Sequence, residues 1–125
     1  MNMSKVIETN RAFLELLAST KSDEQRQALL ETATPGQVRA ISEITLNLLN
    51  RRSKQPDEHV RKKINNNIKF YRTLAKSNRP FARKRQKLIS THQREVDTNQ
   101  TGDGIFSILL PILTGTLFGG LGSKS

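Results

Sequence analysis

The chain has 125 residues and a mass of 14.1 kDa, an amount of sequence typical of one small domain with tails. It contains no cysteine, which excludes disulfides, cysteine-based metal sites and thiol catalysis. The 21 Lys and Arg residues outnumber 11 Asp and Glu residues, and the formal charge of +10 indicates a polyanionic partner, either nucleic acid or an anionic membrane.

Residues 1–50 are nearly neutral and predict a head of three short helices that could pack as a small bundle. Each helix has a start signal, because small polar residues accept hydrogen bonds from the first free backbone N–H groups of a helix. The signals are Thr9 or Asn10, then Ser22 with Gln25, then Thr34 with Pro35 and Gln37. The apolar residues of the third helix, at helical spacing up to Asn50, are Val38, Ile41, Ile44, Leu48 and Leu49.

Residues 51–95 carry fifteen basic and three acidic residues, so all of the excess charge lies in this segment. The acidic start at 56–58 and an apolar stripe up to Ala75 predict one longer helix. Residues 78–80 break it, and a shorter helix follows, with Phe81 and Leu88 facing inward and its cations mostly outward. No stretch alternates like a strand, so the predicted fold class is all-α: a small bundle of short helices plus a longer basic helix.

The last part of the chain changes character twice. Residues 95–104 are polar and predict a linker, and residues 105–125 form a flexible, Gly-rich hydrophobic tail. Its apolar stretch of 17 residues, 105–121, is short of the roughly 20 residues that span a bilayer, and Pro111 weakens it as a helix. The predicted organisation is therefore a head (1–50), a basic segment (51–94), a linker (95–104) and a tail (105–125).

Little in the sequence points to catalysis. There is no phosphate-binding glycine loop, no HExxH and no GxSxG motif. His59 follows two acids at a helix start and His92 lies beside a basic run, so both are expected at the solvated surface. We therefore expect a protein that is not an enzyme and that has no cofactor and no metal site.

The basic segment predicts nonspecific binding of nucleic acid, because each Lys or Arg near a phosphate releases counterions without reading sequence. Phe70, Tyr71 and Phe81 could stack on bases, but their spacing fits a core better, so no sequence-specific readout is expected. The candidate nucleic-acid-binding residues are Arg51, Arg52, Lys54, Arg61, Lys62, Lys63, Lys69, Arg72, Lys76, Arg79, Arg83, Lys84, Arg85 and Lys87.

The hydrophobic tail needs something to cover it, since an exposed apolar segment of this length aggregates. It is expected to dock on a partner or to associate with a membrane. The candidate contact residues are Ile105, Phe106, Ile108, Leu109, Leu110, Pro111, Ile112, Leu113, Leu117 and Phe118. Two alternatives to a DNA-binding protein stay open: a membrane-active or membrane-anchored protein with basic helices on anionic lipid and an inserting tail, and a helical interaction module that uses Val38, Ile41 and Leu48.

The layout resembles a known viral family. The helix at 40–49, the Lys/Arg-rich helix that ends Tyr-Arg-Thr-Leu-Ala at 71–75, the run Arg-Lys-Arg-Gln-Lys-Leu-Ile at 83–89 and the tail from Ile105 are similar to the pX-like proteins of adintoviruses, the Polinton or Maverick elements of animals. That family is in turn similar to the adenovirus precursor of the mu core protein. Residues 90–101, which separate the basic run from the tail here, depart from the family pattern.

The resemblance implies a virion core protein that condenses packaged double-stranded DNA through the basic segment, with a tail that contacts capsid proteins or membrane. It implies a location in the virion and, during assembly, in the host nucleus. Residues 117–121 also fit the loose Leu-x-Gly-Gly-x pattern of adenovirus-type maturation proteases, which makes Gly119, Gly120 and Leu121 a hypothetical cleavage site.

Overall fold

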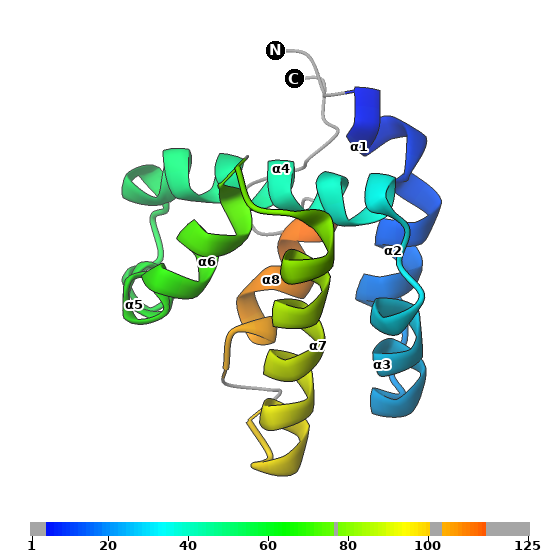
Figure 1. Ribbon diagram of the computed structural model, residues 1–125. Coiled ribbons are helices and arrows are strands. Elements are labelled where there is room, and N and C mark those ends of the chain that lie inside the picture. Colours follow the sequence, from blue (N-terminus) through cyan, green and yellow to red (C-terminus); the bar gives the residue numbers. More distant parts are fainter. Residues whose placement is uncertain (1–4, 77, 101–103, 115–125) are drawn as a thin grey trace.

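The computed structural model describes residues 5–76, 78–100 and 104–114 (Figure 1). Every regular element in these ranges is a helix, which confirms the all-α prediction for this part of the chain. The elements are α1 (Lys5–Thr9), α2 (Arg11–Ser19), α3 (Asp23–Glu31), α4 (Pro35–Arg51), the 3-10 turn η1 (Arg52–Lys54), α5 (Glu58–Asn66), α6 (Ile68–Ala75), α7 (Phe81–Asp97) and α8 (Phe106–Leu113).

The start signals of the head act largely as predicted. At α4 the capping box is complete: the Thr34 hydroxyl accepts from the Gln37 N–H at 3.2 Å, and the Gln37 side chain accepts from the Thr34 N–H at 2.9 Å. At α3 the Ser22 side chain accepts from the Gln25 N–H. Asn10 precedes α2 without capping it, because its side-chain amide donates to the Val6 carbonyl instead.

The single longer helix predicted for the middle is wrong in detail, because the chain breaks at Asn67 into α5 and α6. Asn67 ends a run of three asparagines, residues that favour local side-chain bonds over helix continuation. Its side-chain amide donates to the Lys63 carbonyl at 3.0 Å. The long basic helix is instead α7, whose 17 residues extend into the segment expected to be a linker.

The reversal after α7 is a Schellman motif. Asn99 has a positive φ of 59°, the Asn99 N–H donates to the Val96 carbonyl at 3.2 Å, and the Gln100 N–H donates to the Glu95 carbonyl at 2.7 Å. Asparagine is one of the few residues other than glycine that adopt this left-handed conformation readily. The turn ends α7 and directs the chain back toward the core.

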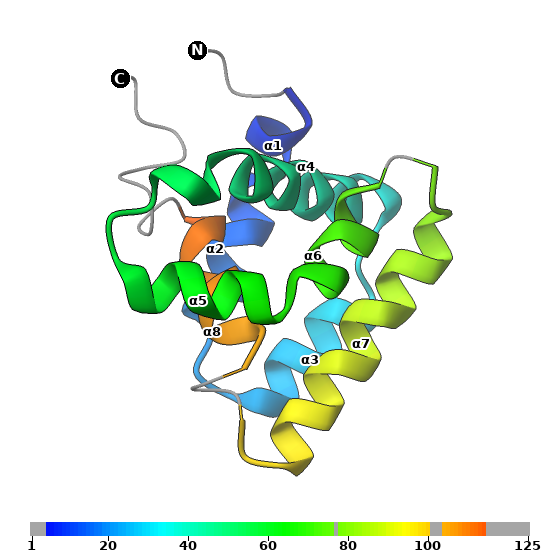
Figure 2. The same cartoon turned by 90° about the vertical axis from the view of Figure 1, so that its left-hand side faces the viewer.

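Helix α8 lies at the centre of the fold, packed against α2, α4 and α5 (Figures 1 and 2). Five side chains of α8 and that of Ile105, just before it, are at most 4% exposed. All six belong to one core with residues of α1–α7. These six are Ile105, Phe106, Ile108, Leu109, Ile112 and Leu113. The sequence predicted them as an exposed contact for a membrane or a partner; that prediction is corrected here, because the chain's own helices cover them.

The remaining tail predictions have other outcomes. Leu110 and Pro111 are partly exposed and line a shallow hollow beside Ala18 of α2. Leu117, Phe118 and the hypothetical cleavage site at Gly119, Gly120 and Leu121 lie outside the described residues. Within the part of the chain that is described, no helix has both the length and the apolar character needed to cross a membrane.

Glu95 of α7 joins the basic helix to α8. Its carboxylate, 2% exposed, accepts from the Ile105 N–H at 2.5 Å and from the Phe106 N–H at 3.2 Å, at the positive end of the α8 dipole. A Cβ on Gly104 would overlap the Glu95 carboxylate and lie 2.9 Å from the Gln100 carbonyl, so a larger residue there would force the Glu95 side chain to move. The predicted linker therefore contains the residue that docks α8.

Tyr71 of α6 holds the same point of the chain from the other side. Its hydroxyl donates to the Ile105 carbonyl at 3.0 Å. Burial, and then the charge of Glu95, raise the pKa of Tyr71 well above its ordinary value, so the hydroxyl keeps its proton. Tyr71 and Phe70 are both buried, as their spacing predicted.

His92 corrects the prediction that both histidines lie at the surface: His59 is exposed, whereas His92 is fully buried between α3 and α7. Its Nε2 lies 3.5 Å from the Arg26 guanidinium and its Nδ1 lies 2.6 Å from the Gln27 side-chain oxygen. A guanidinium only donates, which assigns the proton of a neutral His92 to Nδ1. Burial and the Arg26 charge lower the pKa of His92, and Asp23 opposes this in part.

Candidate nucleic-acid interface

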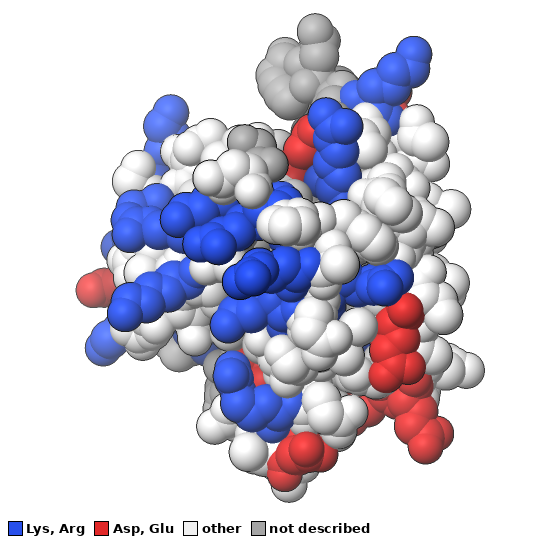
Figure 3. Space-filling model, in the orientation of Figure 1, with Lys and Arg blue, Asp and Glu red and all other residues white. Residues whose placement is uncertain are grey.

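Two stripes of basic side chains lie on neighbouring helices. Lys69, Arg72 and Lys76 follow the i, i+3, i+7 spacing of one face of α6 and its C-cap, and all three are exposed. On α7, Arg83 and Lys87 are four residues apart and are also exposed. Figure 3 shows that Lys and Arg side chains gather over α5, α6 and α7, while acidic side chains gather near α3.

A shallow groove of about 570 Å³ runs between these stripes. Three basic residues lie along it, but carbon atoms form most of its surface; the lining residues are Thr73, Arg79, Ala82, Arg83, Gln86, Lys87 and Ser90. We call Lys69, Arg72, Lys76, Arg79, Arg83 and Lys87 together the cationic face. Because α6 and α7 pack directly on the core, these charges are displayed on a rigid support and not on a tail.

Acidic residues are missing from this part of the sequence. No Asp or Glu occurs between Glu58 and Glu95, and Glu95 is buried on the inner side of α7. Among the described residues the ion pairs join Arg26 to Asp23 and Arg39 to Glu43, both outside the cationic face. The positive charges of the cationic face are therefore not neutralised by neighbouring carboxylates.

The other predicted cations divide by exposure. Arg51, Lys54 and Lys62 are exposed on the end of α4, on η1 and on α5. Four more are partly buried and donate to other groups of the chain: Arg52 to the Leu49 carbonyl, Arg61 to the Gln55 carbonyl, Lys63 to the Ser107 hydroxyl and Arg85 to the Ala33 carbonyl. The guanidinium of Arg85 also lies 4.7 Å from the centre of the Phe81 ring.

Lys84 is the exception among the predicted binding residues, because it is only 8% exposed and lies on the inner side of α7. Its spacing from Leu88, four residues, places both on the buried face, a signal that the density of the basic run masked. Lys84 is therefore removed from the candidate interface. The prediction also missed Arg94, which is exposed and lies on the same side of α7 as Arg83 and Lys87, seven residues after Lys87.

The cationic face has no exposed large apolar side chain. In the described ranges the exposed large hydrophobic residues are Leu16 on α2 and Leu46 on α4. A surface that inserts into lipid needs apolar side chains beside its cations, and one that binds single strands needs aromatic rings. Within the described residues, the cationic face therefore offers positive charge and hydrogen-bond donors and no large exposed apolar group.

In the residues that the structure describes, no group of three or more His, Asp or Glu side chains could hold a metal ion. Comparisons with protein-family models, with curated proteins and with solved structures give no match to this chain.

Proposed function

We propose that this protein is not an enzyme and binds double-stranded DNA without sequence specificity through the cationic face. The observation that carries the proposal is the pair of unneutralised basic stripes on α6 and α7. Lys and Arg bind phosphates and displace the counterions of DNA, a term that does not depend on base sequence.

Two further features support a duplex over other polyanions. The aromatic residues of α6 are buried, so they are not available to stack on the bases of a single strand. The cationic face also lacks the apolar side chains that would anchor it in anionic lipid. The resemblance to pX-like core proteins points the same way and adds a setting for the proposal: packaged DNA in a virion, assembly in the host nucleus, and capsid proteins as further partners.

The test is duplex DNA binding by the full chain, measured by fluorescence anisotropy across salt concentrations. The logarithm of affinity should fall with the logarithm of salt concentration with a slope of about −0.9 per phosphate contact. Removing two exposed cations from the cationic face, in the double variant Lys69→Gln/Lys87→Gln, should make that slope shallower by about 1.8.

The chain offers a matched control. Lys5 and Lys21 are exposed and belong to neither α6 nor α7, so Lys5→Gln/Lys21→Gln removes the same charge outside the cationic face. It should leave the slope unchanged. Equal losses in the two double variants, or an affinity that salt does not weaken, would contradict the proposal. Tighter binding to anionic lipid vesicles than to DNA would favour the membrane alternative.

A further inference from the structure

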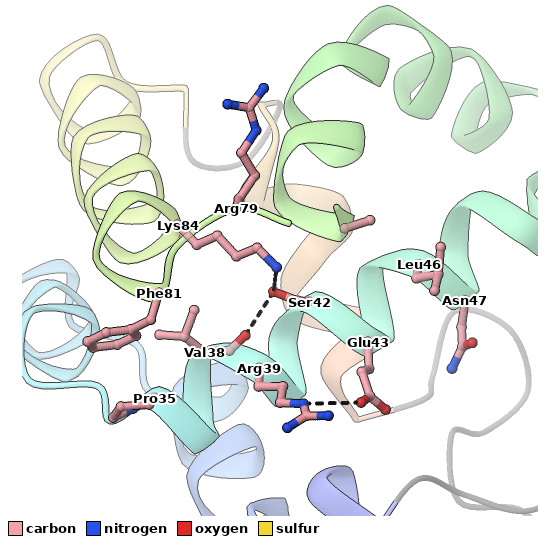
Figure 4. Close-up of a pocket in the computed structure, with 11 residues that line it drawn as sticks. Pro35, Val38, Arg39, Ser42, Glu43, Leu46, Asn47, Arg79, Phe81 and Lys84 are labelled. Atoms are coloured by element: carbon pink, nitrogen blue, oxygen red, sulfur yellow. Dashed lines mark hydrogen bonds and ion pairs between the residues drawn. The ribbon is translucent and has the colours of Figure 1, made fainter. Parts of the chain in front are cut away.

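A second hollow lies on the other side of Arg79, where α4, from Pro35 to Asn47, faces the end of α6 and the start of α7 (Figure 4). Its volume is about 500 Å³, within the range of roughly 300–1,000 Å³ that is typical of small-molecule sites. One part of the wall is apolar, formed by Val38, Leu46, Ala75 and Phe81. Leu46 is one of the two exposed large hydrophobic residues noted above.

A buried cation points into this hollow. Lys84 extends from α7 toward α4, and its ammonium group donates to the Ser42 hydroxyl at 3.2 Å. Ser42 in turn donates to the Val38 carbonyl at 3.1 Å, so its own proton is already used. Neither of the ion pairs found among the described residues includes Lys84. An ammonium group has three protons to donate, and a buried one without a carboxylate is costly.

The charges around the hollow favour an anion. Arg39 and Glu43, both on its rim, lie 3.7 Å apart at their closest charged atoms and largely offset each other. Arg79 also lines the hollow and its Nε has no hydrogen-bond partner in the described structure, but its guanidinium points away from Lys84 and Ser42 (Figure 4), so Lys84 is the cation available to a ligand there. Desolvation, and then the charge of Arg39, lower the pKa of Lys84, which a bound anion would reverse.

We propose that this hollow is a binding site for a small organic anion with an apolar body, whose carboxylate or phosphate head would contact Lys84 and whose body would lie on Val38, Leu46 and Phe81. An anionic head would supply the opposite charge that the Lys84 ammonium lacks, and an apolar body would cover the exposed Leu46 side chain. Arg79 lines both this hollow and the groove of the cationic face, but Lys84, which would hold the head group, is buried on the inner side of α7 and is not part of the cationic face.

The experiment uses four six-carbon probes of different head group and the full chain: hexanoate, hexyl phosphate, hexanol and hexylammonium. Binding is measured by titration calorimetry, and the site is located by amide chemical-shift changes. Hexanoate or hexyl phosphate should shift residues of α4 and the start of α7 and bind at least about tenfold more tightly than hexanol or hexylammonium. The stronger of the two anions identifies the head group.

Lys84→Met keeps the length of the side chain without its charge, and it should fold because an unpaired buried cation is replaced by an apolar group. It should lose at least about tenfold in anion affinity and bind DNA as the parent does. Lys87→Met on the exposed side of the same helix is the control and should bind the anion unchanged.

Three results would overturn the proposal: equal affinities for hexanoate and hexanol, equal losses in Lys84→Met and Lys87→Met, or inorganic phosphate binding as tightly as hexyl phosphate. The last two would mean that the anion only follows the general positive charge of the chain. Because the DNA assay is separate, failure of this site leaves the DNA-binding proposal to its own test.

Discussion

The contact between Glu95 and the start of α8 gives a sharp prediction about stability. Glu95→Ala leaves the N–H groups of Ile105 and Phe106 without their acceptor in a buried position. Hydrogen bonds to a charged group contribute about 1.5–3 kcal/mol each, so the loss should be roughly 3–6 kcal/mol. Glu95→Gln keeps an oxygen acceptor without the charge and should cost about half as much. Whole domains of this kind are stable by only about 5–15 kcal/mol.

Urea denaturation followed by circular dichroism measures these losses as shifts of the midpoint. Asp97→Ala is the control, because Asp97 is exposed and accepts only from the Gln93 side chain, so it should change the free energy of unfolding by less than about 0.5 kcal/mol. Gly104→Ala tests the same contact from the opposite side, since its methyl group would displace the Glu95 carboxylate. If Glu95→Ala cost no more than Asp97→Ala, the reasoning that α8 is docked by this carboxylate would be refuted.

Three further predictions concern other positions in the fold. The fold lowers the pKa of His92, so the stability that depends on neutral His92 is complete above the unfolded pKa of about 6.5. As pH falls below that value, this stability is lost by up to about 1.4 kcal/mol per pH unit. Urea midpoints measured from pH 7 to 5 should show the loss, and His92→Gln should abolish this pH dependence. Asn99→Ala should destabilise by about 1 kcal/mol because of the left-handed backbone, whereas Asn99→Gly should not, as thermal unfolding would show. Tyr71→Phe removes the bond to the Ile105 carbonyl and should cost about 1 kcal/mol in the same assay.

The sequence was most informative where the signal is local. Thr34, Pro35 and Gln37 lie within four residues of one another, and the capping box joins only Thr34 and Gln37, so it could be predicted from the chain alone. The exposed cations of α6 could be predicted for the same reason, because charge in water needs no distant partner. The basic stripes of α6 and α7 lie side by side only because these two helices pack together, and no local sequence pattern specifies that packing.

The errors arose where a polar residue has a buried partner far along the chain. Glu95 was assigned to a linker, since its partners are backbone groups ten and eleven residues away that have no sequence signature. His92 was assigned to the surface because its partners, Arg26 and Gln27, are more than sixty residues away along the chain and leave no local signal. Glu95 and His92 lie on the buried side of α7 together with Lys84 and Leu88. Their helical spacing from Leu88 was the sequence signal that could have predicted their burial.

The central place of α8 changes how the apolar segment should be tested. Burying a large apolar side chain contributes about 1.5–3 kcal/mol, so the six buried side chains at 105–113 contribute roughly 9–18 kcal/mol as an upper estimate. That matches or exceeds the whole stability of a typical domain. Deleting residues 105–125 should therefore unfold the chain, which circular dichroism and amide spectra would reveal as loss of helix and of signal dispersion.

Single substitutions in α8 measure how much each side chain contributes to stability, without deleting the segment. Leu109 is fully buried, so Leu109→Ala should cost about 2–5 kcal/mol, while Leu110→Ala, at a partly exposed position beside it, should cost clearly less. Equal costs, or a folded deletion variant, would mean that α8 is not part of the core. If the deletion variant unfolds, any change in its binding to DNA or lipid is explained by loss of the fold. Such a change is then no evidence that the tail contacts a membrane. The role of the apolar segment must then be tested in the full chain, with substitutions that leave the core of α8 intact.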